Sequence, residues 1–159
     1  MATKRTAPYP AYNYLVNLNL PNGAPKQTEP LGGFSELSGM KTELHISEYR
    51  DGNDKANYVH KYSGMHTTGD ITLKRGVVDT SYLWAWITNA RTNGPSAQQA
   101  GVTITLRDEA NNPVQIYKLT NVTPKGYTGP GLSGKGAGDL AIEELVLAAE
   151  TIEITKPTG

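Results

Sequence analysis

Residues 41–74 decide the fold, and they read KTELHISEYRDGNDKANYVHKYSGMHTTGDITLK. In the first half, Leu44 and Ile46 alternate with polar residues, which is the period-two pattern of a β-strand. A dense turn signal, Asp51-Gly52-Asn53-Asp54, follows. Residues 58–74 then return as a second extended segment, with an interruption expected at Ser63-Gly64. The stretch therefore predicts a long protruding hairpin with a polar tip.

Strand patterns continue on both sides of this hairpin. Residues 102–107 alternate between apolar and polar side chains, and a turn at 109–112 leads to a partner strand. The predicted strands outside the 41–74 hairpin cover residues 12–20, 34–40, 102–107, 114–120 and 140–155. The segment 124–138, rich in Gly and Pro, is expected to be irregular.

One helix is predicted, and it begins near Asp79. Asp79 or Thr80 is a suitable N-cap, because a short oxygen side chain accepts a hydrogen bond from a free first-turn N–H. The helix is expected to end at Asn93-Gly94-Pro95. Trp84 is expected at the edge of the core or in a partner contact. The apolar stripe that faces the core consists of Leu83, Trp86, Ile87 and Ala90.

The pattern predicts a mainly β protein with two packed antiparallel sheets, a sandwich or partial barrel, and one helix. One helix cannot cover both faces and all edges of such sheets, so sheet closure or neighbouring subunits must cover the rest. Residues 102–107 are expected to form one of the shared edges. The expected organisation is a flexible tail at 1–11, a single domain at 12–155 and a short tail at 156–159.

Composition excludes several classes of protein. The 159 residues include 15 Lys plus Arg, 15 Asp plus Glu and no Cys. A net charge of zero argues against nucleic-acid or membrane-surface binding by bulk charge, and it makes self-association easy. Without Cys there are no disulfides, Cys-ligated zinc sites or thiol catalysis. No export signal or membrane anchor is recognised, so folding in the cytoplasm is expected.

No constellation of residues predicts catalysis. Residues 129–136 nearly fit a phosphate-binding loop, but Gly136 replaces the magnesium-binding hydroxyl and no helix is predicted to follow. His45 and His66 are expected on neighbouring strands without a placed carboxylate, which makes a poor metal site. Glu143-Glu144 point to opposite faces of a strand and cannot form an acid–base pair. We therefore expect no catalytic residue, metal, cofactor or nucleotide.

Six motifs stand in order along the chain: GFSELSGM at 33–40, EYRDG at 48–52, SG at 63–64, ITLKRGV at 71–77, LWAW at 83–86 and IEELVL at 142–147. Together they resemble the tail tube family of contractile phages and phage-like contractile injection systems. The resemblance spans residues 12–155. It implies a structural inner tube subunit without enzymatic activity.

The family resemblance also implies an assembly. Six subunits form a ring whose strands close a continuous β-barrel, and the rings stack into a tube that sheath contraction drives through a target envelope. The implied partners are other copies of this chain, a contractile sheath protein, baseplate or spike and terminator proteins at the tube ends, and cargo in the lumen. Assembly in the bacterial cytoplasm is expected, as part of a virion tail or of a cytoplasmic or released injection particle.

The long hairpin is assigned by the resemblance to contact with the adjacent ring. Its charges are mixed in sign, so complementary pairing between opposed ring surfaces is expected, with weaker stacking at high salt. The residues expected at contacts between subunits or rings are Glu43, Glu48, Tyr49, Arg50, Asp51, Asp54, Lys55, Lys61, Lys74 and Arg75.

Two alternatives remain open at this point. A tube-initiator or baseplate-junction paralogue of the same family would share these motifs, and it is expected to form single rings only. A small β ligand-binding module would be a monomer with a concave aromatic site.

Overall fold

A long strand, β7 (Pro113–Thr128), belongs to two sheets in the computed structural model of the chain. Its first half pairs with β6 (Ala100–Arg107) on one side and β9 (Thr151–Thr155) on the other, and its second half pairs with β8 (Ile142–Ala148). The strand passes from one sheet to the other near Asn121. The structure describes residues 6–19, 33–78, 81–94, 100–136 and 138–157.

The bend of β7 lies at Asn121, whose φ is 51°. An angle of 51° lies in the left-handed region, which Asn tolerates better than most residues. The Asn121 side chain also donates to Glu150 Oε2 at 2.7 Å, and Glu150 N donates to Thr120 O at 3.1 Å. These bonds stabilise the bend at which β7 leaves the first sheet.

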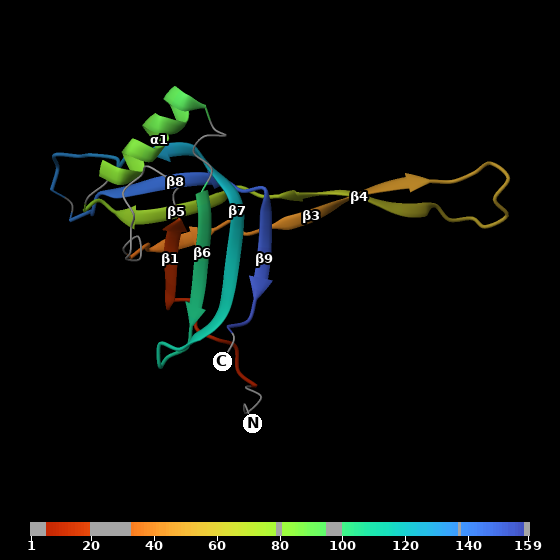
Figure 1. Cartoon of the computed structure of the whole chain (residues 1–159), viewed down its shortest axis with the longest axis horizontal. Helices are drawn as coiled ribbons and strands as arrows, with labels where there is room; N and C mark the ends of the chain where they lie inside the picture. The colour runs from red at the N-terminus through yellow and green to blue at the C-terminus, as the bar shows by residue number, and fades with distance from the viewer. Residues whose placement is uncertain (1–5, 20–32, 79–80, 95–99, 137, 158–159) are drawn as a thin grey trace.

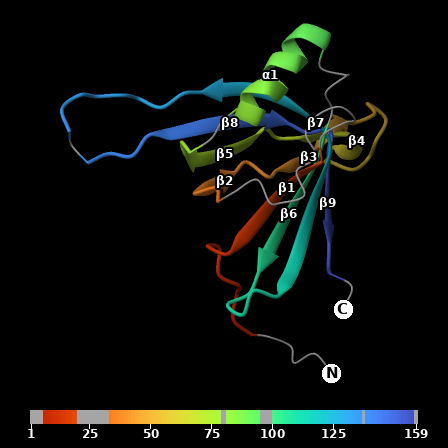
Figure 2. The same cartoon turned by 60° about the vertical axis from the view of Figure 1, so that its left-hand side comes forward.

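The two sheets share β7 and separate on either side of it (Figures 1 and 2). The first sheet has the order β1-β6-β7-β9, where β1 is Tyr14–Asn19. The second has the order β7-β8-β5-β2, where β5 is Ile71–Gly76 and β2 is Glu36–Ser38. All pairings are antiparallel. The prediction of a mainly β chain with antiparallel sheets and one helix is confirmed.

The core lies between the sheets and follows the period of two that the sequence shows. In β5, Ile71 and Leu73 are buried, and in β8 their register partners Leu147 and Leu145 are buried as well. Successive side chains of a strand point to opposite faces, so alternation places one face of each strand inside. The first sheet contributes Val16, Leu18, Val102, Ile104 and Leu119 to the same cluster.

The helix α1 (Ser81–Asn93) packs beside β7, near the second sheet (Figure 1). Leu83 and Trp86 are buried, and Ile87 packs against the core, so the predicted stripe is confirmed at these positions. The predicted N-cap residues 79 and 80 lie outside the described residues.

A two-stranded hairpin of β3 (Thr42–Tyr49) and β4 (His60–Thr68) extends away from both sheets (Figure 1). At its root, Gly39 has a φ of 90°, and an added Cβ would lie 2.1 Å from Asp70 O. Only glycine fits there. The interruption expected at Ser63-Gly64 is a register shift within a continuous β4.

Several strand predictions are wrong in their boundaries. Residues 58–74 do not form one returning strand, because the chain leaves the hairpin after β4 and enters the second sheet as β5. Residues 124–128 are not irregular, because they pair with β8 across a bulge between Pro124 and Gly126. The strand at 102–107 is not an edge, because β1 and β7 flank it within the subunit.

Candidate assembly surfaces

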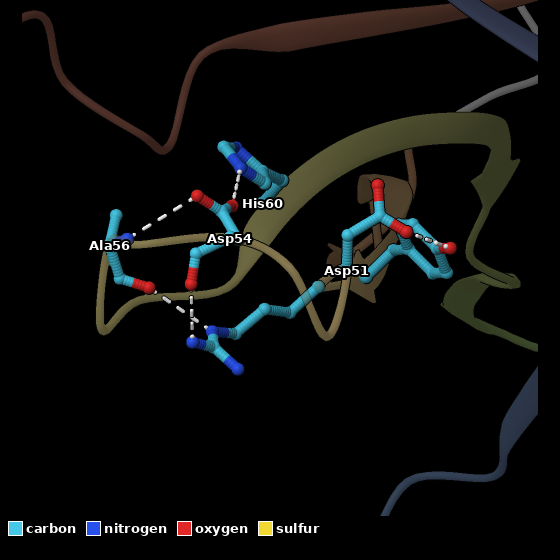
Figure 3. Close-up of polar contacts among 6 residues, drawn as sticks. Asp51, Asp54, Ala56 and His60 are labelled. Atoms are coloured by element: carbon cyan, nitrogen blue, oxygen red, sulfur yellow. Dashed lines mark hydrogen bonds and ion pairs between the residues drawn. The ribbon is translucent and has the colours of Figure 1, made fainter.

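The hairpin tip is held by side chains that bond to its backbone (Figure 3). Arg50 donates from Nε to Ala56 O at 3.1 Å and from Nη2 to Asp54 O at 2.9 Å. Asp54 Oδ2 lies 2.7 Å from His60 Nε2, and Asp54 Oδ1 accepts from Ala56 N at 3.3 Å. The tip therefore has a defined shape although it lies far from the core.

A second set of contacts flanks this tip. Tyr49 donates its hydroxyl proton to Asp51 Oδ1 at 2.7 Å, and this hydrogen bond raises the pKa of Tyr49 above its ordinary value. The rings of Tyr58 and His60 meet edge to face, with centroids 5.4 Å apart. Aromatic pairs prefer this arrangement.

Charged pairs lie at both ends of the hairpin strands. Lys41 and Glu43 approach to 2.7 Å near the root, and Glu48 and Lys61 approach to 3.8 Å across the strands near the tip. Exposed pairs of this kind contribute about 0–1 kcal/mol each.

Between the Lys41–Glu43 pair and the Glu48–Lys61 pair, the hairpin has a segment without Asp, Glu, Lys or Arg. We call this segment the uncharged band and define it as residues 44–47 and 62–68.

Among the strands that the structure describes, the second sheet has a free edge on each side, at β2 and at the second half of β7. Register places Glu36, Lys74, Glu144 and Thr128 in one row across its four strands. Lys74 Nζ lies 3.2 Å from Glu36 Oε2 within this row. Lys125 and Asp70 form another ion pair at the edge of the sheet.

Arg75 lies inside the subunit. Its Nε donates to Glu143 Oε1 at 2.5 Å, and Tyr127 donates to Glu143 Oε2 at 2.8 Å. The hydrogen bond to Glu143, followed by desolvation, raises the pKa of Tyr127. Its guanidinium is buried in this ion pair, so Arg75 is not exposed on the surface of the subunit. Glu143 and Glu144 point to opposite faces, as their adjacency in a strand predicts.

Trp84 lies on the exposed side of α1 and bridges two elements. Its ring meets that of Tyr127 edge to face at 5.8 Å, and the Arg91 guanidinium lies 5.2 Å from the Trp84 ring centroid. About half of the Trp84 surface stays exposed. Trp84 is thus at the edge of the core, and its exposed half remains available to a partner.

The structure brings most of the predicted contact residues together at the hairpin. Lys74 lies apart from them, on the second sheet, and Arg75 is buried. Sequence reasoning missed the roles of His60 and Tyr127, because their partners Asp54 and Glu143 are set by the tip conformation and by strand register. The predicted residues on the hairpin are Glu43, Glu48, Tyr49, Arg50, Asp51, Asp54, Lys55 and Lys61.

No group of three or more potential metal ligands occurs among the described residues. A shallow pocket of about 240 Å³ contains Lys135 of the Gly-rich segment, and no helix begins after that segment in the described part of the chain. The expected lack of nucleotide binding stays a prediction. No helix within the described ranges is long and apolar enough to cross a bilayer.

Comparison with known proteins gives matches in sequence and in fold. The family model described as T4-like virus tail tube protein gp19 matches residues 10–153. No curated protein sequence matches the chain.

Several solved structures share the fold, including the following three. A chain of the anti-feeding prophage baseplate has a TM-score of 0.81 and 24% identity, covering 96% of this chain and 98% of that chain. A chain of the anti-feeding prophage cap gives 0.80 and 23%, covering 98% and 95%. A chain of the sheath–tube complex of PVC, an extracellular contractile injection system, gives 0.78 and 24%, covering 96% and 94%.

Proposed function

We propose that this chain, which belongs to the T4-like virus tail tube protein family and is a structural tube subunit, forms rings of six that stack into a hollow tube. The observation that carries this proposal is the second sheet, which in the described part of the chain has four strands and a free edge on each side. Unpaired strand edges present rows of N–H and C=O groups to a neighbouring chain.

The directions of the two edge strands are compatible with closure. Each strand of the second sheet is antiparallel to the next, so β2 and the second half of β7 run in opposite directions. Placing β2 of one subunit beside β7 of the next continues the same antiparallel order. Repetition of this contact around a ring leaves no free edge in the barrel.

The hairpin is proposed to contact the adjacent ring through its charged residues and its ordered tip. Head-to-tail stacking opposes two different surfaces, which allows charges of opposite sign to meet. The residues proposed for contacts between subunits or rings are Glu43, Glu48, Tyr49, Arg50, Asp51, Asp54, Lys55, Lys61 and Lys74.

The tube is proposed to assemble in the bacterial cytoplasm within a contractile sheath, with baseplate or spike and terminator proteins at its ends and cargo in its lumen. Family membership and the fold shared with baseplate, cap and sheath–tube chains support these partners. The proposed role is structural, without catalysis.

Electron microscopy of the purified chain tests the function. Long hollow tubes formed without other components support the main tube subunit. Single rings alone would favour a junction ring, and monomers at all concentrations would contradict the proposal.

Engineered cysteines test ring closure, because the chain has no Cys of its own. Glu36→Cys and Thr128→Cys share a row but lie three strand spacings apart, about 14 Å, so a disulfide can join only different subunits. We expect a ladder of cross-linked species that ends at six. The control pair Glu36→Cys with Lys118→Cys should give no ladder, since Lys118 belongs to the first sheet.

A further inference from the structure

A row of polar and aromatic contacts crosses the core-facing side of the second sheet. Glu143 of β8 accepts hydrogen bonds from Arg75 of β5 at 2.5 Å and from Tyr127 of β7 at 2.8 Å. The Arg75 guanidinium lies 5.8 Å from the ring centroid of Phe34, just before β2. These four residues, which we call the buried row, therefore connect β7, β8 and β5 with the segment that enters β2.

The two charged members of the buried row are almost fully enclosed. Arg75 is 7% exposed and Glu143 is 2% exposed, and no other charged residue in the described part of the chain is buried. A buried ion pair adds little net stability, because the cost of desolvation offsets the attraction. It can instead select one arrangement, since every alternative leaves a charge buried without its partner.

The apolar side chains of β5 and β8 do not by themselves select one register. A shift of two residues keeps every side chain on its own face of the sheet, because strands have a period of two. Leu73 now opposes Leu145, and after such a shift it would oppose Leu147, which is also buried. The same shift would place Arg75 opposite Leu145 and separate it from Glu143.

The turns do not select the register either. The elements α1, β6 and β7 lie between β5 and β8 along the chain, so no hairpin turn joins these two neighbours. Residues 129–141 connect β7 to β8, and this connection is much longer than the loops of about 2–5 residues that set the register of hairpins. The buried row is therefore the feature of this sheet that distinguishes the observed register from a shifted one.

We propose that the buried row fixes the register of the second sheet and thereby keeps β2 and the second half of β7 aligned for ring closure. This inference rests on the proposed ring. A shift of two residues moves one strand by about 7 Å along its neighbour. Closure of a barrel requires a fixed total stagger, and a ring of six repeats the same offset in every subunit. A shifted sheet would leave the ring open although each subunit stays folded.

Two cysteine pairs report the register in the unassembled subunit. Thr72 and Val146 lie opposite each other, so Thr72→Cys with Val146→Cys reports the observed register. Thr72→Cys with Ala148→Cys reports the shifted register, because diagonal neighbours are about 7–8 Å apart, too far for an unstrained disulfide. With a mild oxidant, the first pair should cross-link readily in the otherwise unaltered chain and the second pair hardly at all.

Removal of both charges is the main test. With Arg75→Met and Glu143→Leu, the rate of the shifted cross-link relative to the observed one should rise about tenfold or more, because no buried charge now opposes the shift. Arg75→Lys keeps the cation and should keep the ratio of the unaltered chain. Leu119→Ala in the first sheet is the control for a general loss of stability, and it should not raise the shifted cross-link.

A second variant moves the carboxylate instead of removing it. Glu143→Leu with Leu145→Glu places the carboxylate two positions further along β8, where only the shifted register brings it opposite Arg75. The shifted cross-link should then predominate. An unchanged ratio in the variant without charges, or the observed register after the carboxylate is moved, would overturn the proposal.

The consequence for assembly is measured with the cysteines Glu36→Cys and Thr128→Cys that test ring closure. In the variant without charges their ladder should seldom reach six, whereas Arg75→Lys should restore it. Full closure despite a shifted register would overturn the link between the buried row and the ring. Absence of a ladder to six in the otherwise unaltered chain would instead contradict the proposed ring, while the register cross-links of the unassembled subunit would stand.

Discussion

In β5 the residues Ile71, Leu73 and Arg75 are buried at every second position, whereas every residue of β3 in the hairpin is exposed. Both strands alternate between two faces. The difference is that the first sheet packs against one face of β5, whereas no residue that the structure describes covers either face of β3. Isolated two-stranded hairpins are at best marginally stable in water. The comparison indicates that the body stabilises the subunit and that the hairpin contributes little to that stability, which is compatible with the contacts proposed for it outside the subunit.

The largest expected effect on subunit stability comes from the buried ion pair of the body. Arg75→Ala leaves Glu143 buried without its cation and should lower the free energy of unfolding by about 3–5 kcal/mol. Urea denaturation of the unassembled subunit measures this loss. The double variant Arg75→Met with Glu143→Leu should recover most of it, and a loss below about 1 kcal/mol for Arg75→Ala would contradict the interpretation.

Truncation of equivalent leucines compares the two regions directly. Leu147→Ala in the core should cost about 2–5 kcal/mol, because it removes packed methyl groups and leaves a cavity. Leu44→Ala in the hairpin should change subunit stability by no more than about 0.5 kcal/mol. Similar losses in denaturation experiments would show that the hairpin packs on the body.

A smaller effect is expected from Tyr127→Phe, which removes the hydroxyl that donates to Glu143. The expected cost is about 1 kcal/mol near neutral pH. Because folding raises the Tyr127 pKa, this stabilisation is present below the unfolded pKa and is lost as pH rises through the folded pKa. Unfolding free energies of both proteins from pH 8 to 11 should therefore converge at the alkaline end.

The smallest effect on subunit stability is expected at the hairpin tip. Replacing residues 51–57 by a two-residue turn should leave the melting temperature of the subunit nearly unchanged, because the tip has no contact with the core. Tubes should nevertheless fail or fragment in electron micrographs. The control Asn57→Ser should assemble normally, and full-length tubes from the shortened chain would place ring stacking elsewhere.

Much of the fold could be predicted from local pattern. Period-two alternation identified the strands, and turn residues identified the hairpins, because both signals arise within a few neighbouring residues. The pairing of residues 124–128 with β8 could not be predicted, because a bulge accommodates the Pro and Gly that indicate a loop. The Arg75–Glu143 pair joins residues 68 positions apart, which no local signal reports.

The sequence by itself determined the strand periodicity, the polar tip, the helix stripe and the resemblance to the tail tube family. Only the tertiary structure decided which face of each strand is covered. Alternation marks two faces, but burial depends on what packs against them, so Arg75 lies inside while Leu44 and Ile46 lie outside. Packing between distant segments therefore separates the residues that hold the subunit together from those that stay exposed on its surface.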